Sequence, residues 1–403
     1  MPYYQRNLHI LATTIFLAAL SWNQVIPFLP LFMKQMGIPQ GELLRWVGII
    51  YALQAAASIV CTPFWGKIAD HYGRKPMTVR AGFCLAAIYL GMSICQTPLQ
   101  LAVLRFLNGA LTGFIPSSIA LIATNTPRNK AARAIAVVQT TSALGLIIGP
   151  AAGGFLASVA GYRGSMQVSG AAVLLSTLLV WWLVKEPHKP EIAEPTTLLQ
   201  DFVVSMRSRV LGSVLMIGAV AGIVGGAVSP ILVLHLSGLD GGVSVATTGI
   251  VLSLPPLALL MTTLLWTKLG ESRGHHLAIR VGMTGGGLAL LALACSRDIY
   301  LFSAIYFISG ALLASATPCS AAIILHKVPI SFRGRAYGMQ QSAAMLGALV
   351  GPIAASYIGG RLGLASVFVF TGVVTIAGTL AFAAIAAHWV HWTEEQAAAE
   401  FPA

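Results

Sequence analysis

Charged side chains are scarce in this chain, and their positions single out the few places where chemistry could occur. The 403 residues include 24 Lys and Arg and 12 Asp and Glu, or 9% of the chain. Four charged residues and one histidine nevertheless fall within the ten residues "GKIADHYGRK", which run from Gly66 to Lys75. Both flanks of this segment are apolar, so its charge is concentrated far beyond the average for the chain.

Arg105 is the one charged residue that lies inside a long apolar segment. Moving an ion from water into an apolar environment costs several kcal/mol, which a well-placed polar or charged partner can offset. We therefore expect Arg105 to face other polar groups or a ligand. Asn108 follows one helical turn later. The pair could bind a substrate or relay a proton. Alternatively, backbone carbonyls and neighbouring polar groups hold Arg105 in a structural role.

The acidic residues limit the possible mechanisms, because all twelve lie in loops, at segment ends or in the tail. Possible proton carriers are therefore restricted to Glu42, His235 and Asp298, each near the end of an apolar segment. A lone His at a helix end is also compatible with a purely structural role. We find no nucleophile–base set and no metal-ligand spacing among the five cysteines. The sequence thus predicts neither an enzyme nor a metal site.

The elements that carry these residues are expected to be membrane-spanning helices. The hydrophobic fraction is 57% and the mean hydropathy is +0.81, both too high for a soluble chain of this length. Apolar runs of about 20 residues recur without strict alternation, which favours helices over a barrel. The predicted spans are 7–33, 43–67, 76–96, 98–123, 132–158, 163–184, 208–236, 244–268, 275–295, 298–325, 334–358 and 363–389.

Basic residues orient these spans. Of the Lys and Arg residues, 18 fall at the N-terminus and on the side of the even-to-odd loops, and 5 fall on the other side. By the positive-inside rule, both termini are cytoplasmic. The net charge of +12 is therefore a consequence of topology and does not indicate nucleic-acid binding. We expect a six-helix bundle at 1–184, a cytoplasmic linker at 185–207, a second bundle at 208–392 and a tail at 393–403.

An internal repeat supports this division. Residues 127–154 align without gaps on residues 329–356 at a constant spacing of 202. The aligned identities include Pro127 with Pro329, Arg133 with Arg335, and Gly149 with Gly351. Two six-helix halves with parallel similarity are typical of carriers that expose a site at mid-membrane to each side in turn.

Several segments resemble motifs of the major facilitator superfamily of transporters. "GKIADHYGRK" is similar to the cytoplasmic loop signature of that family, with Gly66, Asp70, Gly73, Arg74 and Lys75 in the signature positions. Its counterpart at 267–276, "TKLGESRGHH", departs from the signature at Thr267 and Glu271. "RFLNG" (105–109) resembles the Arg-x-x-x-Gly motif of the fourth span. "GLIIGPAAGG" (145–154) resembles the fifth-span motif of exporters.

The overall pattern is most similar to the bacterial twelve-span drug:proton antiporters, of the multidrug and fosfomycin–deoxycholate exporter type. The resemblance implies an all-α membrane protein with two pseudo-symmetric six-helix bundles in the bacterial inner membrane. It also implies that the loop signature latches the two halves together. Positive charge alone would explain Arg74 and Lys75, but not Asp70 together with the two glycines.

The fifth-span motif implies a tight, hinge-like seam between the fifth and eighth spans. Glycines four residues apart fall on one helical face and allow close helix approach, and a proline bends the span. Plain helix packing is the alternative. The residues concerned are Gly145, Gly149, Pro150, Gly153 and Gly154, and in the second half Gly347, Gly351 and Pro352.

Sparse polar groups among aromatic residues suit loose recognition of apolar ligands. Besides Arg105, Asn108 and Trp22, the candidate substrate-binding or proton-relay residues are Asn23, Gln24, Tyr51, Gln54, Gln139, Tyr306 and Gln341, each of which packing could also explain. We therefore expect a monomeric exporter of small amphiphilic compounds, neutral or anionic, driven by a proton gradient without ATP or another cofactor. Uniport, a different coupling ion, export of an endogenous metabolite, siderophore or lipid precursor, and a non-transporting sensor or lipid scramblase remain alternatives.

Overall fold

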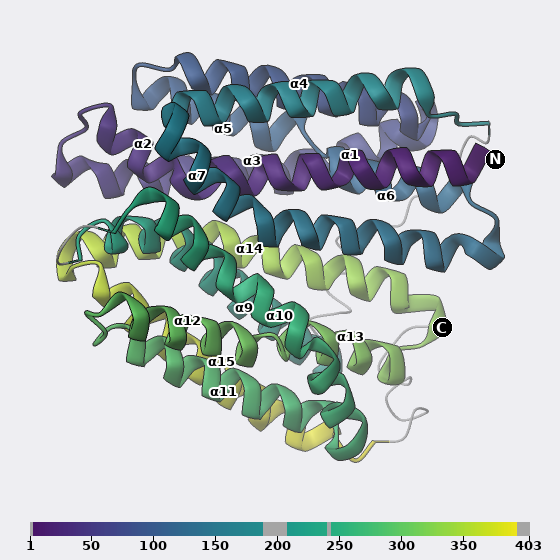
Figure 1. The fold of residues 1–403 in the computed structure, drawn as a ribbon. Coiled ribbons are helices and arrows are strands. Elements are labelled where there is room, and N and C mark those ends of the chain that lie inside the picture. The colour runs from purple at the N-terminus through teal and green to yellow at the C-terminus, as the bar shows by residue number, and fades with distance from the viewer. Residues whose placement is uncertain (1–2, 188–207, 240–242, 393–403) are drawn as a thin grey trace. The chain divides into compact units, whose positions relative to one another are not determined.

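The computed structural model describes residues 3–187, 208–239 and 243–392, and within these ranges all regular structure is helical (Figure 1). The first half comprises α1 (Tyr3–Val25), the 3₁₀ turn η1 (Ile26–Phe28), α2 (Leu29–Gln35), α3 (Gln40–Tyr72), α4 (Arg74–Ile94), α5 (Pro98–Leu111), α6 (Phe114–Asn125) and α7 (Arg128–Leu183). The second half comprises α9 (Arg209–Leu236), α10 (Val245–Arg273), α11 (His275–Leu293), α12 (Ile299–Leu313), α13 (Ala316–Lys327), α14 (Ile330–Leu362) and α15 (Ala365–Trp389). Most of the predicted linker at 185–207 and the predicted tail at 393–403 lie outside the described residues.

Eleven helical stretches of the described chain are long and apolar enough to cross a membrane, and one of them holds two predicted spans. That stretch is α7, which at 56 residues is far too long for one crossing of a hydrocarbon layer about 30 Å thick. Gly161 interrupts it with φ 72° and ψ 170°, a conformation that residues with a side chain rarely adopt, and the chain turns back there (Figure 1). The prediction of separate spans at 132–158 and 163–184 agrees with this turn.

The first span is interrupted at its two prolines. Between α1 and α2 the chain forms η1, with Pro27 inside the turn and Pro30 at the start of α2. Proline lacks a backbone donor, so the regular hydrogen bonding of the helix is lost at these positions.

Two further breaks were not predicted from the sequence. The fourth span divides into α5 and α6 at Thr112 and Gly113, where Gly113 has φ 131°. The tenth span divides into α12 and α13 at Ala314 and Ser315. Both breaks lie at equivalent positions of the repeat, so the duplicated architecture extends to the local backbone.

A tryptophan of the neighbouring helix donates a hydrogen bond to each break. The indole N–H of Trp65 donates to the carbonyl of Ala110 at 2.6 Å, and that of Trp266 donates to the carbonyl of Ala311 at 2.7 Å. A carbonyl that lacks its helical hydrogen bond cannot bond to water inside a membrane, so it needs a donor from another side chain. The two tryptophans therefore make the interrupted helices tolerable.

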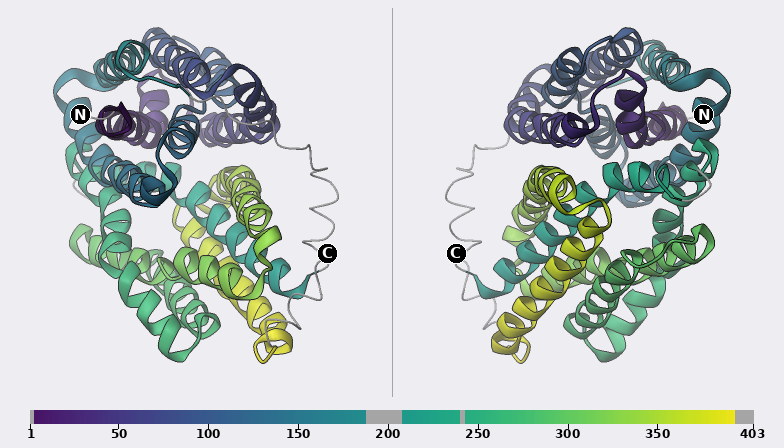
Figure 2. Two further views of the ribbon diagram at one scale, coloured as in Figure 1. Left: turned by 90° about the vertical axis from the view of Figure 1, so that its right-hand side faces the viewer. Right: turned by 90° about the vertical axis from the view of Figure 1, so that its left-hand side faces the viewer.

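The contacts divide the chain into two compact units. Unit 1 comprises residues 1–193 and 236–253, and unit 2 comprises residues 194–235 and 254–403. Figure 2 shows the helices up to Leu183 (purple to teal) bundled together, and the helices at the green-to-yellow end of the chain bundled likewise. The predicted domain limits at 184 and 208 remain a prediction, since the contacts assign the start of α10 to unit 1.

We predict that Trp65→Phe lowers the free energy of unfolding by about 1–3 kcal/mol, because the aromatic ring stays but the carbonyl of Ala110 loses the indole donor. Trp266→Phe should cost less, because the hydroxyl of Thr262 still donates to the carbonyl of Ala311 at 3.2 Å. Thermal unfolding of the purified protein in detergent measures the effect. Trp182→Phe is the matched control, because Trp182 is 70% exposed. Equal stability of all three variants would contradict this role.

Candidate functional site

Arg105 reaches the interior of unit 1 because its helix packs unusually close to α3. Helix α5 begins with a capping box formed by Thr97 and Gln100, and it carries Arg105 and Gly109 on one face. A Cβ on Gly109 would collide with the backbone carbonyl of Gln54 in α3 and lie 3.0 Å from the Cβ of Ala57. This contact explains the Arg-x-x-x-Gly spacing. Gly109 permits the close approach of α5 to α3, and that approach buries Arg105, which lies one helical turn before the glycine.

The Arg105 side chain lies against aromatic rings and lacks an anionic partner. It is 1% exposed, and its guanidinium carbon lies 5.3 Å from the ring centre of Tyr51 and 5.8 Å from that of Trp22. In the described part of the chain it makes no ion pair, and its Nε and Nη1 atoms make no hydrogen bond. Aromatic faces offset part of the cost of burying a cation. The guanidinium therefore keeps donors available for an incoming group.

Two more buried polar side chains belong to this cluster. Asn108 is fully buried, and neither its amide nitrogen nor its amide oxygen has a partner among the residues that the structure describes. Tyr89 of α4 is also fully buried with an unpartnered hydroxyl, and it lies close enough to Arg105 for the two groups to interact electrostatically. We refer to Trp22, Tyr51, Tyr89, Arg105 and Asn108 as the Arg105 cluster. Sequence reasoning missed Tyr89, because a tyrosine within an apolar span carries no signal of its own.

Other predicted site residues of unit 1 have structural partners. Gln24 is buried and donates from Nε2 to the backbone carbonyl and hydroxyl of Ser165, at 3.0 and 3.2 Å. Asn23 donates to the carbonyl of Ala19 at 2.8 Å, and the Tyr51 hydroxyl donates to the carbonyl of Ile26 at 2.5 Å. The side chain of Gln54 is half-buried, and that of Gln139 is exposed. The structure therefore brings Tyr51 to Arg105 and uses Gln24 to join α1 to α7.

The predicted residues of unit 2 do not form an equivalent cluster. Tyr306 is buried, with its ring 6.1 Å from that of Phe302, whereas Gln341 is exposed. His235 packs against Phe302 and Phe368, with ring centres 5.7 and 5.2 Å away, and its Nε2 atom has no partner.

The two carboxylates proposed as proton carriers lie at helix starts. Glu42 is exposed in the first turn of α3. Asp298 is the N-cap of α12 and accepts from the amide of Leu301 at 2.8 Å, which gives it a structural role in starting the helix.

The segment 66–75, here called the Asp70 turn, joins α3 to α4 through Gly73. Gly73 has φ 106° and both ends α3 and begins α4, so a side chain there would be strained. Asp70 lies in the last turn of α3 and accepts from Nη2 of Arg74 at 2.8 Å. This carboxylate therefore binds Arg74 and not the free amides of α4.

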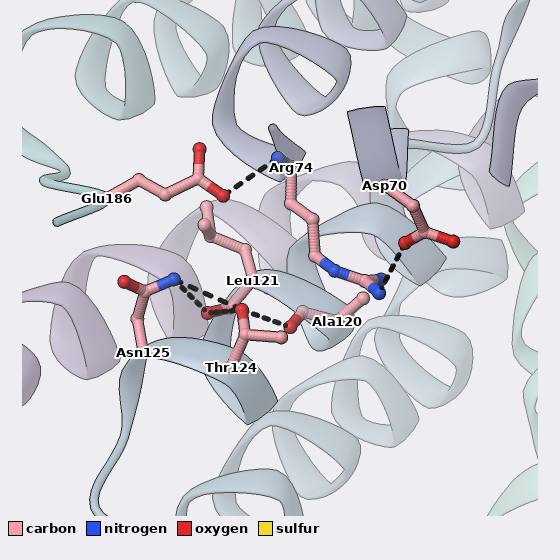
Figure 3. A network of polar contacts seen from close by, with 7 residues as sticks. All are labelled: Asp70, Arg74, Ala120, Leu121, Thr124, Asn125 and Glu186. Atoms are coloured by element: carbon pink, nitrogen blue, oxygen red, sulfur yellow. Dashed lines mark hydrogen bonds and ion pairs between the residues drawn. The ribbon is translucent and has the colours of Figure 1, made fainter. Parts of the chain in front are cut away.

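The amides at the start of α4 are bound instead by Glu186, which follows α7. Its two carboxylate oxygens accept from the backbone amides of Arg74 and Lys75, at 2.8 and 2.9 Å. The positive end of the helix dipole adds to these bonds. Figure 3 shows Arg74 at the centre, with its backbone bound to Glu186 and its side chain bound to Asp70. Sequence analysis assigned Glu186 to the linker, because nothing in a lone Glu beside a proline indicates a distant helix start.

The glycines of the fifth-span motif mainly contact the first span, so the predicted partner was wrong for three of them. A Cβ on Gly145 would lie 2.7 Å from that of Ala19, and one on Gly149 would lie 2.6 Å from that of Asn23. A Cβ on Gly153 would collide with the carbonyl of Gln24. These glycines share one helical face, and α1 occupies it.

The remaining two positions of the motif do contact the eighth span. A Cβ on Gly154 would lie 2.5 Å from the carbonyl of Val245 and 3.0 Å from Cα of Gly249, both in the part of α10 that belongs to unit 1. A Cβ on Gly249 would in turn collide with the carbonyl of Pro150. The motif thus serves two helix contacts on adjacent faces.

The repeat builds the same close packing in unit 2, between α9 and α14. A Cβ on Gly347 would lie 2.7 Å from the amide of Ile223, and one on Gly351 would lie 3.0 Å from the amide of Ala227. Gly226 faces back toward α14, where its Cβ would lie 3.1 Å from Cδ of Pro352. Close backbone approach is therefore common to both halves.

A family model described as Major Facilitator Superfamily matches residues 11–241 and 210–402 of the chain. The chain belongs to the major facilitator superfamily. Solved structures of similar fold include a mutant form of the nucleoside transporter NupG (TM-score 0.80, 15% identity, covering 94% of this chain and 99% of that one). A bacterial homologue of the human lysosomal transporter Spinster gives a TM-score of 0.75 at 15% identity and covers 96% of each chain.

Relatives of known name are similar over nearly the whole length. A protein of Proteus mirabilis named multidrug resistance protein MdtG is 28% identical over 375 residues, which is 92% of this chain and 93% of the relative. The protein of the same name from Salmonella arizonae is 29% identical over 377 residues, 93% of each chain. Membership in the superfamily makes the protein a multi-pass membrane transporter with the major facilitator fold, as the resemblance of its motifs predicted.

We predict that Gly351→Ala destabilises this transporter, because the new Cβ would collide with the carbonyl of Ile223 in α9. Gly338→Ala in the same helix is the matched control, since a Cβ there meets nothing within 4 Å. The control is expected to gain up to about 1 kcal/mol from helix propensity. Thermal unfolding in detergent separates the two; a more stable Gly351→Ala would contradict the packing role.

We predict that Glu186→Ala costs about 1–2 kcal/mol of stability, because the start of α4 loses two bonds and a favourable charge. Glu186→Gln should restore part of the loss, since its amide oxygen still accepts one bond. Glu42→Ala removes an exposed glutamate from another first turn and serves as the control. Thermal unfolding in detergent measures the stability of the three variants. Equal stability of Glu186→Ala and the control would refute the role of Glu186 at the start of α4.

Proposed function

We propose that this transporter exports small amphiphilic compounds, neutral or anionic, by alternating access and in exchange for protons. It acts as a monomer in the inner membrane, with both termini in the cytoplasm, and it uses no ATP. The names of its relatives in Proteus and Salmonella, which span the same length, support multidrug export. The bias of basic residues toward one side supports the orientation.

The observation that carries the substrate preference is the Arg105 cluster. A guanidinium presents five N–H donors in a planar fork that matches a carboxylate, and two nitrogens of Arg105 have no partner. The neighbouring rings of Trp22 and Tyr51 offer apolar surface to the body of an amphiphile. A permanent cation would instead meet the repulsion of a buried like charge. An anionic amphiphile therefore fits the cluster best.

Proton exchange has one candidate carrier that the geometry favours. Of the three groups that the sequence suggested, Asp298 caps a helix and Glu42 is exposed, whereas His235 keeps a ring nitrogen without a partner among aromatic side chains. A histidine changes charge near neutral pH, which suits a proton carrier. We therefore propose His235 ahead of Glu42 and Asp298.

The Asp70 turn is proposed to act as the cytoplasmic latch of the transport cycle. Its two ends are held within unit 1, by the Asp70–Arg74 ion pair and by Glu186 on the amides of α4. An ion pair at 39% exposure of the carboxylate contributes at most about 1 kcal/mol, which is enough to shift a two-state equilibrium several-fold.

We predict that proteoliposomes with an imposed pH gradient accumulate deoxycholate, an anionic amphiphile, and that each transport event dissipates part of the gradient. Arg105→Gln should reduce this transport by about tenfold or more, because the charge that is proposed to bind the carboxylate of the substrate is lost. Transport of tetraphenylphosphonium, a permanent cation, should be weak in the wild type. Radiolabel uptake and a pH-sensitive dye measure both quantities.

Matched variants and lipids separate the alternatives. Arg163→Gln removes an arginine of the same unit that binds the carbonyls of Ser93 and Cys95, so it controls for general loss of charge. Uptake without any effect on the gradient would favour uniport or another ion. Movement of labelled lipid without substrate transport would favour a scramblase. Preference for tetraphenylphosphonium, or full activity of Arg105→Gln, would refute the proposed substrate class.

A further inference from the structure

A second site is indicated at the end of unit 1 that carries the Asp70 turn, on the surface of α4 and α7. A recess of about 530 Å³ opens there, away from the Arg105 cluster. It is lined by Lys75, Pro76, Val79, Arg80, Phe83 and Trp181. The first five come from the opening turns of α4, and Trp181 comes from the last turn of α7.

The polar part of the recess is cationic and short of anionic partners. The guanidinium carbon of Arg80 lies 3.4 Å from the ring centre of Trp65. Its Nε and Nη1 atoms are buried and have no hydrogen-bond partner among the described residues. Within the described residues, the side chain of Lys75 makes no ion pair. Glu186 attracts Lys75 electrostatically, but both of its oxygens already accept from backbone amides. Lys75 is therefore near a single carboxylate whose oxygens are already occupied, and within the described residues Arg80 makes no ion pair.

The other part of the recess is aromatic and faces outward. The rings of Phe83 and Trp181 meet edge to face at 5.9 Å. Trp181 is 51% exposed, and Trp182 stacks beside it at 6.4 Å and is 70% exposed. Exposed tryptophans near the end of a membrane span mark the level of the lipid headgroups. The cations and the apolar rings thus meet at the boundary between headgroups and acyl chains.

We propose that this recess binds an anionic phospholipid. Its phosphodiester lies between Lys75 and Arg80, and its acyl chains run along Phe83 and Trp181. Arg80 lines the recess, and its guanidinium supplies charge-assisted donors to the phosphate oxygens. Basic pockets beside membrane helices commonly bind such headgroups. A free phosphate would share the polar contacts but would leave the aromatic side uncovered, which is why we assign a lipid.

The proposal is tested on the full chain in nanodiscs that contain a small fraction of lipid brominated on its acyl chains. Bromine quenches tryptophan fluorescence at short range, so Trp181 reports occupancy of the recess. We expect brominated phosphatidylglycerol to quench more strongly than brominated phosphatidylcholine at the same mole fraction. The double variant Lys75→Gln with Arg80→Gln should abolish this preference. Each cation removed should lower the binding of phosphatidylglycerol relative to phosphatidylcholine by about fivefold.

The control pair, Lys67→Gln with Arg133→Gln, removes the same charge from exposed positions outside the recess and should keep the preference. Trp181→Phe should remove the lipid-selective part of the quenching even where the recess variant folds poorly. A selective signal that is unchanged in Trp181→Phe overturns the proposal. So does an absent preference for phosphatidylglycerol, or an equal loss in the control pair. Excess inorganic phosphate at matched ionic strength should leave the preference intact; its loss would assign the site to free phosphate instead.

Discussion

Satisfying the backbone without water is the constraint on which the rest of this structure depends. Inside a hydrocarbon layer an unpaired carbonyl or amide costs several kcal/mol, so each span must be helical and each interruption needs a donor from elsewhere. The breaks between α5 and α6 and between α12 and α13 obey this rule through Trp65 and Trp266. Because a tryptophan N–H donates to a carbonyl at the helix break in both halves of the repeat, this interaction is a feature of the duplicated architecture.

Close packing of helices follows from the same environment. Apolar side chains gain little from leaving lipid, so helices associate through van der Waals contact, for which small residues allow the nearest approach. Gly149 against α1 and Gly351 against α9 are equivalent uses of this principle. Gly109 applies it to bring Arg105 beside Tyr51. A residue without a side chain thereby positions the one charge within the Arg105 cluster.

Charge is placed where its burial is compensated. Arg105 lies against aromatic rings, Glu186 accepts from two amides of α4, and Arg80 stacks on Trp65. The sequence indicated Arg105 because a lone charge in an apolar run is visible in one dimension. It offered no indication of the role of Glu186, since the residue and the amides that it binds are more than a hundred positions apart. Trp65 likewise connects α5 and α4, through its N–H and its ring face respectively.

Composition and periodicity alone determined the helical class, the positions of the spans and the repeat, because hydropathy and breaker residues act locally along the chain. The motifs also determined the family. Tertiary structure alone decided which helix each glycine meets, so Gly145, Gly149 and Gly153 contact α1 while Gly154 contacts α10. It also decided that Tyr89 joins Arg105 and that Gln24 does not. The physical reason is that a helix presents several faces, and only packing determines what each face meets.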